Sequence, residues 1–275
     1  MKTQAELKAE GFRVSIRWLC QFLRIPRSRM YRKHHGRSSH YRLNANLVKR
    51  IRRVIDEYPY YGLRRIHWKI NRDGGSSVNR KAVHRILKLK RWSMKKRPSG
   101  MRPRAKGWRS RTHQPDTRWA IDTSHFSTEQ DGWCHITAVI DCCDRQIVGW
   151  RISRSGKAEI AAAALEDALV RRKPKSGLRL RSDNGLVFSS KVFGQKLRSG
   201  GLRQEYITPY TPEQNGLIER WFGTLKTECI WLHNFKTLSE ARNAIDNFVE
   251  HYNNERPHRA LNMLTPANWR EKFAA

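Results

Sequence analysis

The sequence lacks the features that mark membrane, secreted and zinc-binding proteins. It contains no run of eighteen apolar residues, so no membrane-spanning helix is expected. Its N-terminus has no apolar signal-peptide core. None of its five cysteines forms a C-x-x-C pair or a His/Cys spacing typical of zinc. We therefore expect reduced thiols in a cytoplasmic protein without membrane association.

Acidic residues are scarce in the first part of the chain. Residues 1–115 contain 33 Lys and Arg but only 5 Asp and Glu, whereas residues 116–275 contain 23 and 19. Such a concentration of positive charge repels itself unless a polyanion neutralises it, and nucleic acid is the polyanion that fits. An anionic membrane surface is the alternative, but the basic part is not one long amphipathic helix.

The basic part of the chain contains several short segments with helical patterns. Residues 14–33 read as helix, turn and helix, broken at Pro26, within a helix-turn-helix-like segment at 1–40. A second unit, residues 41–95, has three segments with apolar residues at helical spacing: 46–59, 61–71 and 78–92. We expect a helix-turn-helix DNA-binding domain there. The alternative is a basic helical bundle that binds protein.

The outward faces of these helices carry the candidate DNA contacts. They are Arg64, Arg65, Arg80, Lys81 and Arg85. Residues 96–115 are rich in Pro, Gly and cations without periodicity, which indicates a basic linker.

The composition changes after Pro115, where an α/β domain at 116–275 is expected. Alternating or β-rich runs predict strands at 117–126, 133–143, 145–153 and 178–183, and helical patterns lie at 157–172, 189–201, from about 215 and at about 239–254. The first three strands have short connections, so they predict an antiparallel meander within a mixed sheet.

Three carboxylates occupy informative positions in this domain. Asp122 lies inside the first strand between apolar residues, where a lone charge is costly unless it is paired or binds a cation. Asp183 ends the fourth strand, so the two carboxylates meet if these strands are neighbours. Glu219 stands in the first turn of the helix that follows, with Lys226 nearly two turns later on the same side.

The motifs around these residues resemble those of DDE transposases and retroviral-type integrases. They are "AIDTSHF" around Asp122, "RSDNGLVF" around Asp183 and "TPYTPEQNGLIERWFGTLK" around Glu219, with 35 residues between Asp183 and Glu219. With "YGLRRI" and "HYNNERPHRALNMLTPANW", the chain more narrowly resembles the second-frame catalytic protein of the insertion-sequence-three transposases. No His/Cys array precedes the core, so the resemblance to retroviral integrases is limited to that core.

The resemblance implies a ribonuclease H-like core with a mixed five-stranded sheet, and metal-dependent cleavage and joining of DNA strands. Asp122, Asp183 and Glu219 are then the catalytic residues and the ligands of two Mg²⁺ ions, for which Mn²⁺ is expected to substitute. Lys226 is expected to hold a DNA phosphate. Arg220 and Tyr210 are further candidate DNA contacts near the site.

The resemblance also implies partners. They are double-stranded DNA, both element ends and target, further copies of the chain on that DNA, and an upstream first-frame helix-turn-helix protein to which the chain is fused or with which it works. The expected location is the bacterial cytoplasm, in association with the nucleoid. The alternatives are a non-catalytic DNA-binding regulator with a decayed integrase core, a nuclease acting on RNA–DNA hybrids, and a basic scaffold protein.

Overall fold

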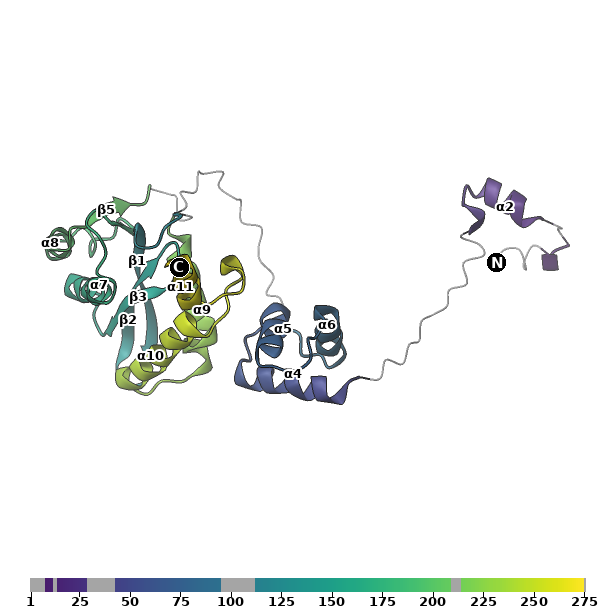
Figure 1. The fold of residues 1–275 in the computed structure, drawn as a ribbon, viewed down its shortest axis with the longest axis horizontal. Helices are drawn as coiled ribbons and strands as arrows, with labels where there is room; N and C mark the ends of the chain where they lie inside the picture. The colour runs from purple at the N-terminus through teal and green to yellow at the C-terminus, as the bar shows by residue number, and fades with distance from the viewer. Residues whose placement is uncertain (1–7, 12–13, 29–42, 95–111, 209–213, 275) are drawn as a thin grey trace. The chain divides into compact units, whose positions relative to one another are not determined.

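The computed structural model in Figure 1 describes residues 8–11, 14–28, 43–94, 112–208 and 214–274. The chain divides into two compact units, Met1–Asn44 and Ala45–Ala275. Within the described residues, no helix is long and apolar enough to cross a membrane.

The first unit contains the helix α2 (Ile16–Phe22). It begins where it does because the Ser15 side chain accepts a hydrogen bond from the backbone N–H of Trp18 at 3.1 Å. Leu19 and Cys20 are its buried residues. The first helix expected within 14–33 is therefore present, and most of the second lies outside the described residues.

The second unit begins with three helices, α4 (Ala45–Glu57), α5 (Leu63–Arg72) and α6 (Arg80–Leu89). Asn79 caps α6 by accepting from the N–H of Lys81 at 2.8 Å. The helices pack through their apolar stripes, which consist of Ile51, Val54, Ile66, Ile70, Val83, Ile86 and Leu87. The helical patterns in residues 46–92 therefore form the three expected helices.

A five-stranded mixed sheet follows. Its strands are β1 (Arg118–Thr128), β2 (Gly132–Asp141), β3 (Ile147–Ser153), β4 (Arg179–Ser182) and β5 (Arg203–Tyr206). The order across the sheet is β3-β2-β1-β4-β5. The first three strands form the expected antiparallel meander, whereas β4 joins β1 in parallel and β5 joins β4 in parallel.

Helices cover both faces of this sheet, as Figure 1 shows. They are α7 (Ala158–Arg172) and α8 (Lys191–Ser199) on one face, and α9 (Gly216–Glu228) and α10 (Leu238–Asn254) on the other. The turns η2 (Ile230–Leu232) and η3 (Arg259–Leu261) and the helix α11 (Pro266–Ala274) complete the chain. The sequence patterns did not predict α11.

Alternation along β1 assigns its side chains to two separate cores. Trp119 and Ile121 pack with α7 and α8, whereas Ala120 and Phe126 pack with α9 and α10. Asp122 lies two residues after Ala120 on the same strand, so its side chain points to the same face of the sheet, the one that α9 covers. The close fit on the opposite face depends on Gly149 of β3, where a Cβ atom would lie 2.2 Å from the backbone oxygen of Ala164.

Two fully buried carboxylates organise the turn between β2 and β3. Asp141 accepts from the backbone N–H groups of Cys143 and Asp144 at 2.7 and 3.1 Å. Asp144 accepts from Arg172 at 2.8 Å and from Arg270 of α11 at 3.0 Å. Both aspartates therefore have structural roles at this turn.

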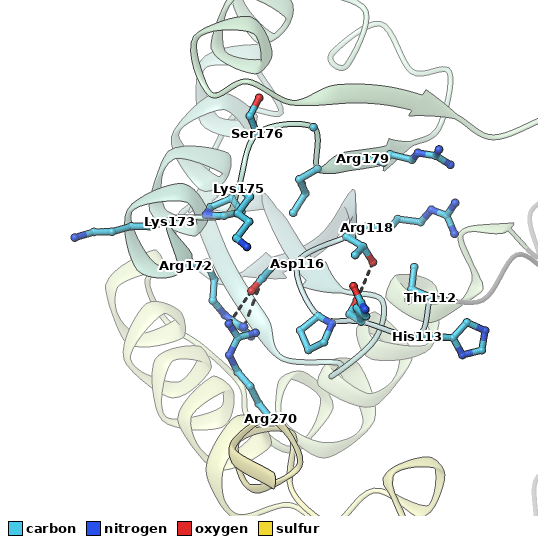
Figure 2. A pocket seen from close by; sticks show the side chains of 16 residues that line it. Thr112, His113, Asp116, Arg118, Arg172, Lys173, Lys175, Ser176, Arg179 and Arg270 are labelled. Carbon is cyan, nitrogen blue, oxygen red and sulfur yellow. Dashed lines mark hydrogen bonds and ion pairs between the residues drawn. The ribbon is translucent and has the colours of Figure 1, made fainter. Parts of the chain in front are cut away.

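The same arginines reach Asp116 beside a surface pocket of about 950 Å³, shown in Figure 2. Arg270 donates to Asp116 at 2.6 Å, and Arg172 lies 3.5 Å from its other carboxylate oxygen. The network ties α7, α11 and the start of β1 to the β2–β3 turn, which makes α11 part of the core domain.

We expect Asp144→Ala to lower the free energy of unfolding by about 3 kcal/mol, because it leaves the buried Arg172 without its close partner. Urea denaturation followed by circular dichroism measures this. Asp167→Ala is the matched control, since the Arg151–Asp167 pair is exposed and its loss should cost below about 1 kcal/mol. Equal losses in the two variants would contradict the structural role of Asp144.

Candidate active site

The pairing of β1 with β4 brings two of the predicted carboxylates together. The parallel register places Arg118 beside Arg179 and Ala120 beside Arg181. Continued by two residues, the same register sets Asp122 opposite Asp183, on strands about 4.8 Å apart. The first and fourth strands are thus neighbours, which is the condition on which the sequence argument depended.

The third carboxylate, Glu219, is carried by helix α9, which packs on one face of the sheet. Its buried stripe, Ile218, Trp221, Phe222 and Leu225, packs on the same side of the sheet as Ala120. Glu219 lies in its first turn and Lys226 in its last. Both side chains act electrostatically on Asp122, so the helix brings a carboxylate and an ammonium group into range of the strand pair.

The carboxyl group of Asp122 has a raised pKa. Burial is the main cause, the nearby carboxylates of Asp183 and Glu219 add to it, and the backbone N–H of Thr123 and the charge of Lys226 act in the opposite direction, for a net pKa of about 6. That N–H donates to Asp122 at 2.7 Å. An acid whose ionisation is opposed by burial and by two like charges is a group that a bound cation would stabilise.

The donor set suits a hard divalent cation. Asp122, Asp183 and Glu219 present only carboxylate oxygens, the ligands preferred by Mg²⁺ and Mn²⁺. In the described part of the chain, no three His, Cys, Asp or Glu side chains are already grouped as a metal centre. A two-ion site needs few protein ligands, because water and phosphate oxygens complete each shell.

A buried arginine that the sequence analysis did not single out fixes the start of α9. Arg181 of β4 donates to Glu205 of β5 at 2.5 Å and to the backbone carbonyl of Gln214 at 2.7 Å. Arg118 donates to the same Glu205 at 2.8 Å. Burial alone would raise the pKa of Glu205, but the two arginines outweigh it and lower that pKa.

Arg181 lies two residues before Asp183. Its hydrogen bond to the Gln214 carbonyl holds the backbone just before Asn215, the residue that precedes α9. It therefore sets the position of Glu219 relative to the strand carboxylates. The sequence signal that could have identified Arg181 is the alternation in "RLRSD", which places its side chain on the same face of the strand as Asp183.

The other predicted site residues are distributed over two parts of the second unit. Arg220 lies exposed on α9 beside Glu219, and Tyr210 lies outside the described residues. Of the predicted DNA contacts on α5 and α6, Arg64, Arg80, Lys81 and Arg85 have exposed side chains. Arg65 differs from them, since it is partly buried and its guanidinium lies 3.2 Å from Glu228.

Comparisons with known proteins agree with this architecture. Two family models described as "Integrase core domain" match residues 112–212 and 200–266, and one described as "HTH-like domain" matches residues 42–98. The transposase InsD for insertion element IS2A/D/F/H/I/K of Escherichia coli is 29% identical over 288 residues, covering 98% of this chain and 94% of that protein.

A longer relative and two viral structures are also similar. The insertion element IS2A uncharacterized 48.2 kDa protein of Escherichia coli is 29% identical, and the match spans 66% of its length. A chain of the simian T-cell lymphotropic virus intasome in complex with PP2A regulatory subunit B56 gamma is 19% identical, with a TM-score of 0.48 over 76% of this chain and 70% of that one. The HTLV-2 integrase catalytic core domain in complex with magnesium (trimeric form) is 18% identical, with a TM-score of 0.47 over 57% and 97%.

An HTH-like domain followed by a ribonuclease H-like core with a mixed five-stranded sheet defines a protein of the integrase-core class. Within that class, the chain is similar over nearly its whole length to an insertion-element transposase, in agreement with the insertion-sequence-three resemblance of its motifs. The family resemblance of the sequence motifs is thereby confirmed.

Removing the charge of Asp122 should stabilise the metal-free protein. Because the folded pKa of about 6 lies above the ordinary value of 3.8, this carboxyl group favours the fold below pH 3.8, and that contribution is lost as the pH rises through 6. In EDTA at pH 7.5, Asp122→Asn should gain roughly 1–2 kcal/mol in free energy of unfolding, and the gain should vanish near pH 4.

Denaturation curves at several pH values measure this difference. Asp246→Asn, which changes an exposed carboxyl group on α10, is the control and should change little. Adding Mg²⁺ should stabilise the wild type but not Asp122→Asn. A variant less stable than the wild type in EDTA at pH 7.5 would refute the electrostatic account.

Arg181→Met should impair the site through the position of α9. We expect a loss of roughly 2 kcal/mol in unfolding free energy, because Glu205 and the Gln214 carbonyl lose charge-assisted hydrogen bonds. At a temperature where the variant is fully folded, its strand-transfer rate should still fall about tenfold or more. Arg179→Met, which changes an exposed arginine at the start of the same strand, should leave the rate unchanged, and an unaffected Arg181→Met would show that this arginine does not position Glu219.

Proposed function

We propose that Asp122, Asp183 and Glu219 form the catalytic site of this transposase and hold two Mg²⁺ ions. The observation that carries the proposal is the β1–β4 register, which sets Asp122 opposite Asp183 beneath the helix that bears Glu219. Enzymes of this family cleave DNA strands and join them to a target. The reaction is phosphoryl transfer, with water or a 3′-hydroxyl as the attacking group.

Each side chain has a distinct part in this reaction. Asp122, on which both other carboxylates act, would serve both ions, while Asp183 and Glu219 would each help to hold one. The bound cations would lower the pKa of the attacking hydroxyl and stabilise the leaving oxygen. Mn²⁺ is expected to replace Mg²⁺, because both prefer oxygen ligands.

Lys226 is placed to hold the substrate rather than the metal. Its ammonium group acts on Asp122 from the last turn of α9, so a DNA phosphate beside the carboxylates would meet a compact positive charge. Arg220, one residue after Glu219, and Tyr210 are proposed as further contacts to the strand.

The helical part of the second unit is proposed as the DNA-anchoring domain. Its exposed cations Arg64, Arg80, Lys81 and Arg85 fit contacts to phosphates. Arg65 remains a candidate contact, although its present partner is Glu228. The proposed boundaries are residues 1–40 and 41–95 for the helical segments, 96–115 for the linker and 116–275 for the core.

Two partners complete the proposal. Synapsis of two element ends requires more than one copy of the chain on DNA, so we propose a homo-oligomer. We also propose that the chain works with, or fused to, a first-frame helix-turn-helix protein, a proposal supported by the greater length of the IS2A relative. The alternative of a regulator with a decayed core is disfavoured, because all three carboxylates are present in the expected order.

Strand joining by the purified protein tests the proposed site. The substrate is a short duplex carrying an element end with a free 3′-hydroxyl, in Mg²⁺ and again in EDTA. Asp122→Asn, Asp183→Asn and Glu219→Gln should each reduce joining on the order of 10³-fold or more while retaining DNA binding. Glu166→Gln, an exposed residue of α7, is the matched control.

Joining that survives one of the three substitutions would remove that residue from the site. If the wild type itself is inactive but binds DNA, the assay is repeated with the first-frame protein fused upstream. Activity restored by the fusion supports the partner proposal, whereas continued inactivity of the fused protein favours the regulator.

A further inference from the structure

A second cationic pocket lies beside the carboxylate site, between α9, α10, the β2–β3 turn and the segment that leads into η3. Its volume is about 410 Å³. Five arginines line it, namely Arg65, Arg145, Arg220, Arg256 and Arg259. None of its described lining residues is acidic, so the pocket concentrates positive charge.

Only part of this charge is balanced. Glu228 receives two hydrogen bonds from Arg256, both of 2.7 Å, and it is also the partner of Arg65. The other three, Arg145, Arg220 and Arg259, form no ion pair with any carboxylate in the described part of the chain. A strong positive potential therefore remains in the pocket.

Buried polar atoms along its wall also lack partners. The indole Nε1 of Trp221, the Nε of Arg145 and the Nε2 of His258 make no hydrogen bond in the structure. Trp221 is 1% exposed and His258 is 8% exposed. An indole N–H can only donate, and leaving it buried without an acceptor is costly, so the unpaired N–H groups of Trp221 and Arg145 indicate that an acceptor-rich group belongs in the pocket.

The backbone at Arg145 is strained. Its φ of +65° lies in the left-handed region, where glycine or asparagine is favoured and a long side chain is unfavourable. A glycine at this position would adopt the same backbone conformation with less strain. The arginine that occupies it extends its guanidinium into the pocket. Strain retained beside a ligand-sized cavity is typical of a binding position.

From this cavity, these unpaired cations and these unsatisfied donors, we propose that the pocket binds a phosphate group, supplied by a DNA strand or by a free polyphosphate. Tetrahedral phosphate offers several acceptor oxygens to arginine forks and to an indole N–H. Binding of a DNA phosphate in this pocket rests on the proposed function, whereas binding of a free polyphosphate does not.

The environment of the titratable groups agrees with an anion site. Burial, followed by the positive charges of Arg256 and Arg65, lowers the pKa of His258 to about 3. Burial also lowers the pKa of Arg145, and the charge of Arg220 adds to that effect. Burial is the larger cause of both shifts, and the part due to neighbouring arginines is positive charge that a bound anion would relieve.

Helix α9 places this pocket next to the catalytic carboxylates. Leu217, Arg220 and Thr224 line the pocket at helical spacing, while Glu219 and Lys226 belong to the adjoining stripe. One strand crossing α9 would therefore place one phosphate at the carboxylates and another in the pocket. The pocket thus defines where the backbone of the bound DNA passes.

The test is binding by the full chain in EDTA, so that the result does not depend on metal chemistry. The probes are a fluorescein-labelled DNA duplex, measured by anisotropy, and inorganic tripolyphosphate, measured by calorimetry and by the shift in Tm. Arg145→Gly removes the guanidinium and the strain together, so its Tm should equal the wild-type value or exceed it by a few degrees. Arg259→Gln removes an exposed pocket cation without changing the turn.

Lys173→Gly is the matched control. Lys173 also has a left-handed backbone, with φ of +44°, and carries one positive charge, and its exposed side chain points away from the other labelled residues in Figure 2. Arg145→Gly should weaken binding about tenfold or more, whereas Lys173→Gly should weaken it less than about threefold.

Weaker binding of both probes by Arg145→Gly and Arg259→Gln supports a DNA phosphate in the pocket. Weaker binding of tripolyphosphate alone supports a free polyphosphate as the occupant. If neither variant weakens either probe more than Lys173→Gly does, the pocket is not a phosphate site and the inference is overturned.

Discussion

The parallel pairing of β1 with β4 is the contact on which the rest of the catalytic domain depends. It brings a partly buried aspartate on one strand opposite an aspartate that follows the next strand, an arrangement that is unfavourable without a cation. The protein tolerates it because both neighbouring layers are firmly packed, with Trp119 and Trp221 almost fully buried on opposite faces of the sheet. Stability lost at Asp122 is thus linked to the proposed ability to bind metal.

Arginine–carboxylate networks hold the elements around this strained centre. Arg181 links β4, β5 and the residue before α9 through Glu205 and the carbonyl of Gln214, and Arg270 links α11 to the β2–β3 turn through Asp144. Guanidinium groups suit this task because each offers several donors in a fixed plane. The abundance of arginine in the chain therefore serves packing in the core as well as attraction of DNA.

Helix α9 connects the two functional surfaces proposed here. One stripe carries Glu219 and Lys226, the next carries Arg220 and Thr224, and its apolar stripe fixes both against the sheet. Any movement of the helix would displace the third carboxylate and the phosphate pocket together. The hydrogen bond from Arg181 to the Gln214 carbonyl restrains such movement at the end of the helix where Glu219 lies.

Most helices and the three-stranded meander could be predicted from the sequence by itself, which also singled out the three candidate carboxylates, because amphipathic periodicity and short motifs are local properties. Only the tertiary structure decided that Asp183 stands opposite Asp122, that Arg181 positions α9 and that Arg145 faces an anion-sized pocket. It also added α11, whose weak apolar pattern is compensated by the ion pairs of Arg270. These features depend on contacts between residues far apart in the chain, which are selected by burial and charge pairing after the local elements have formed.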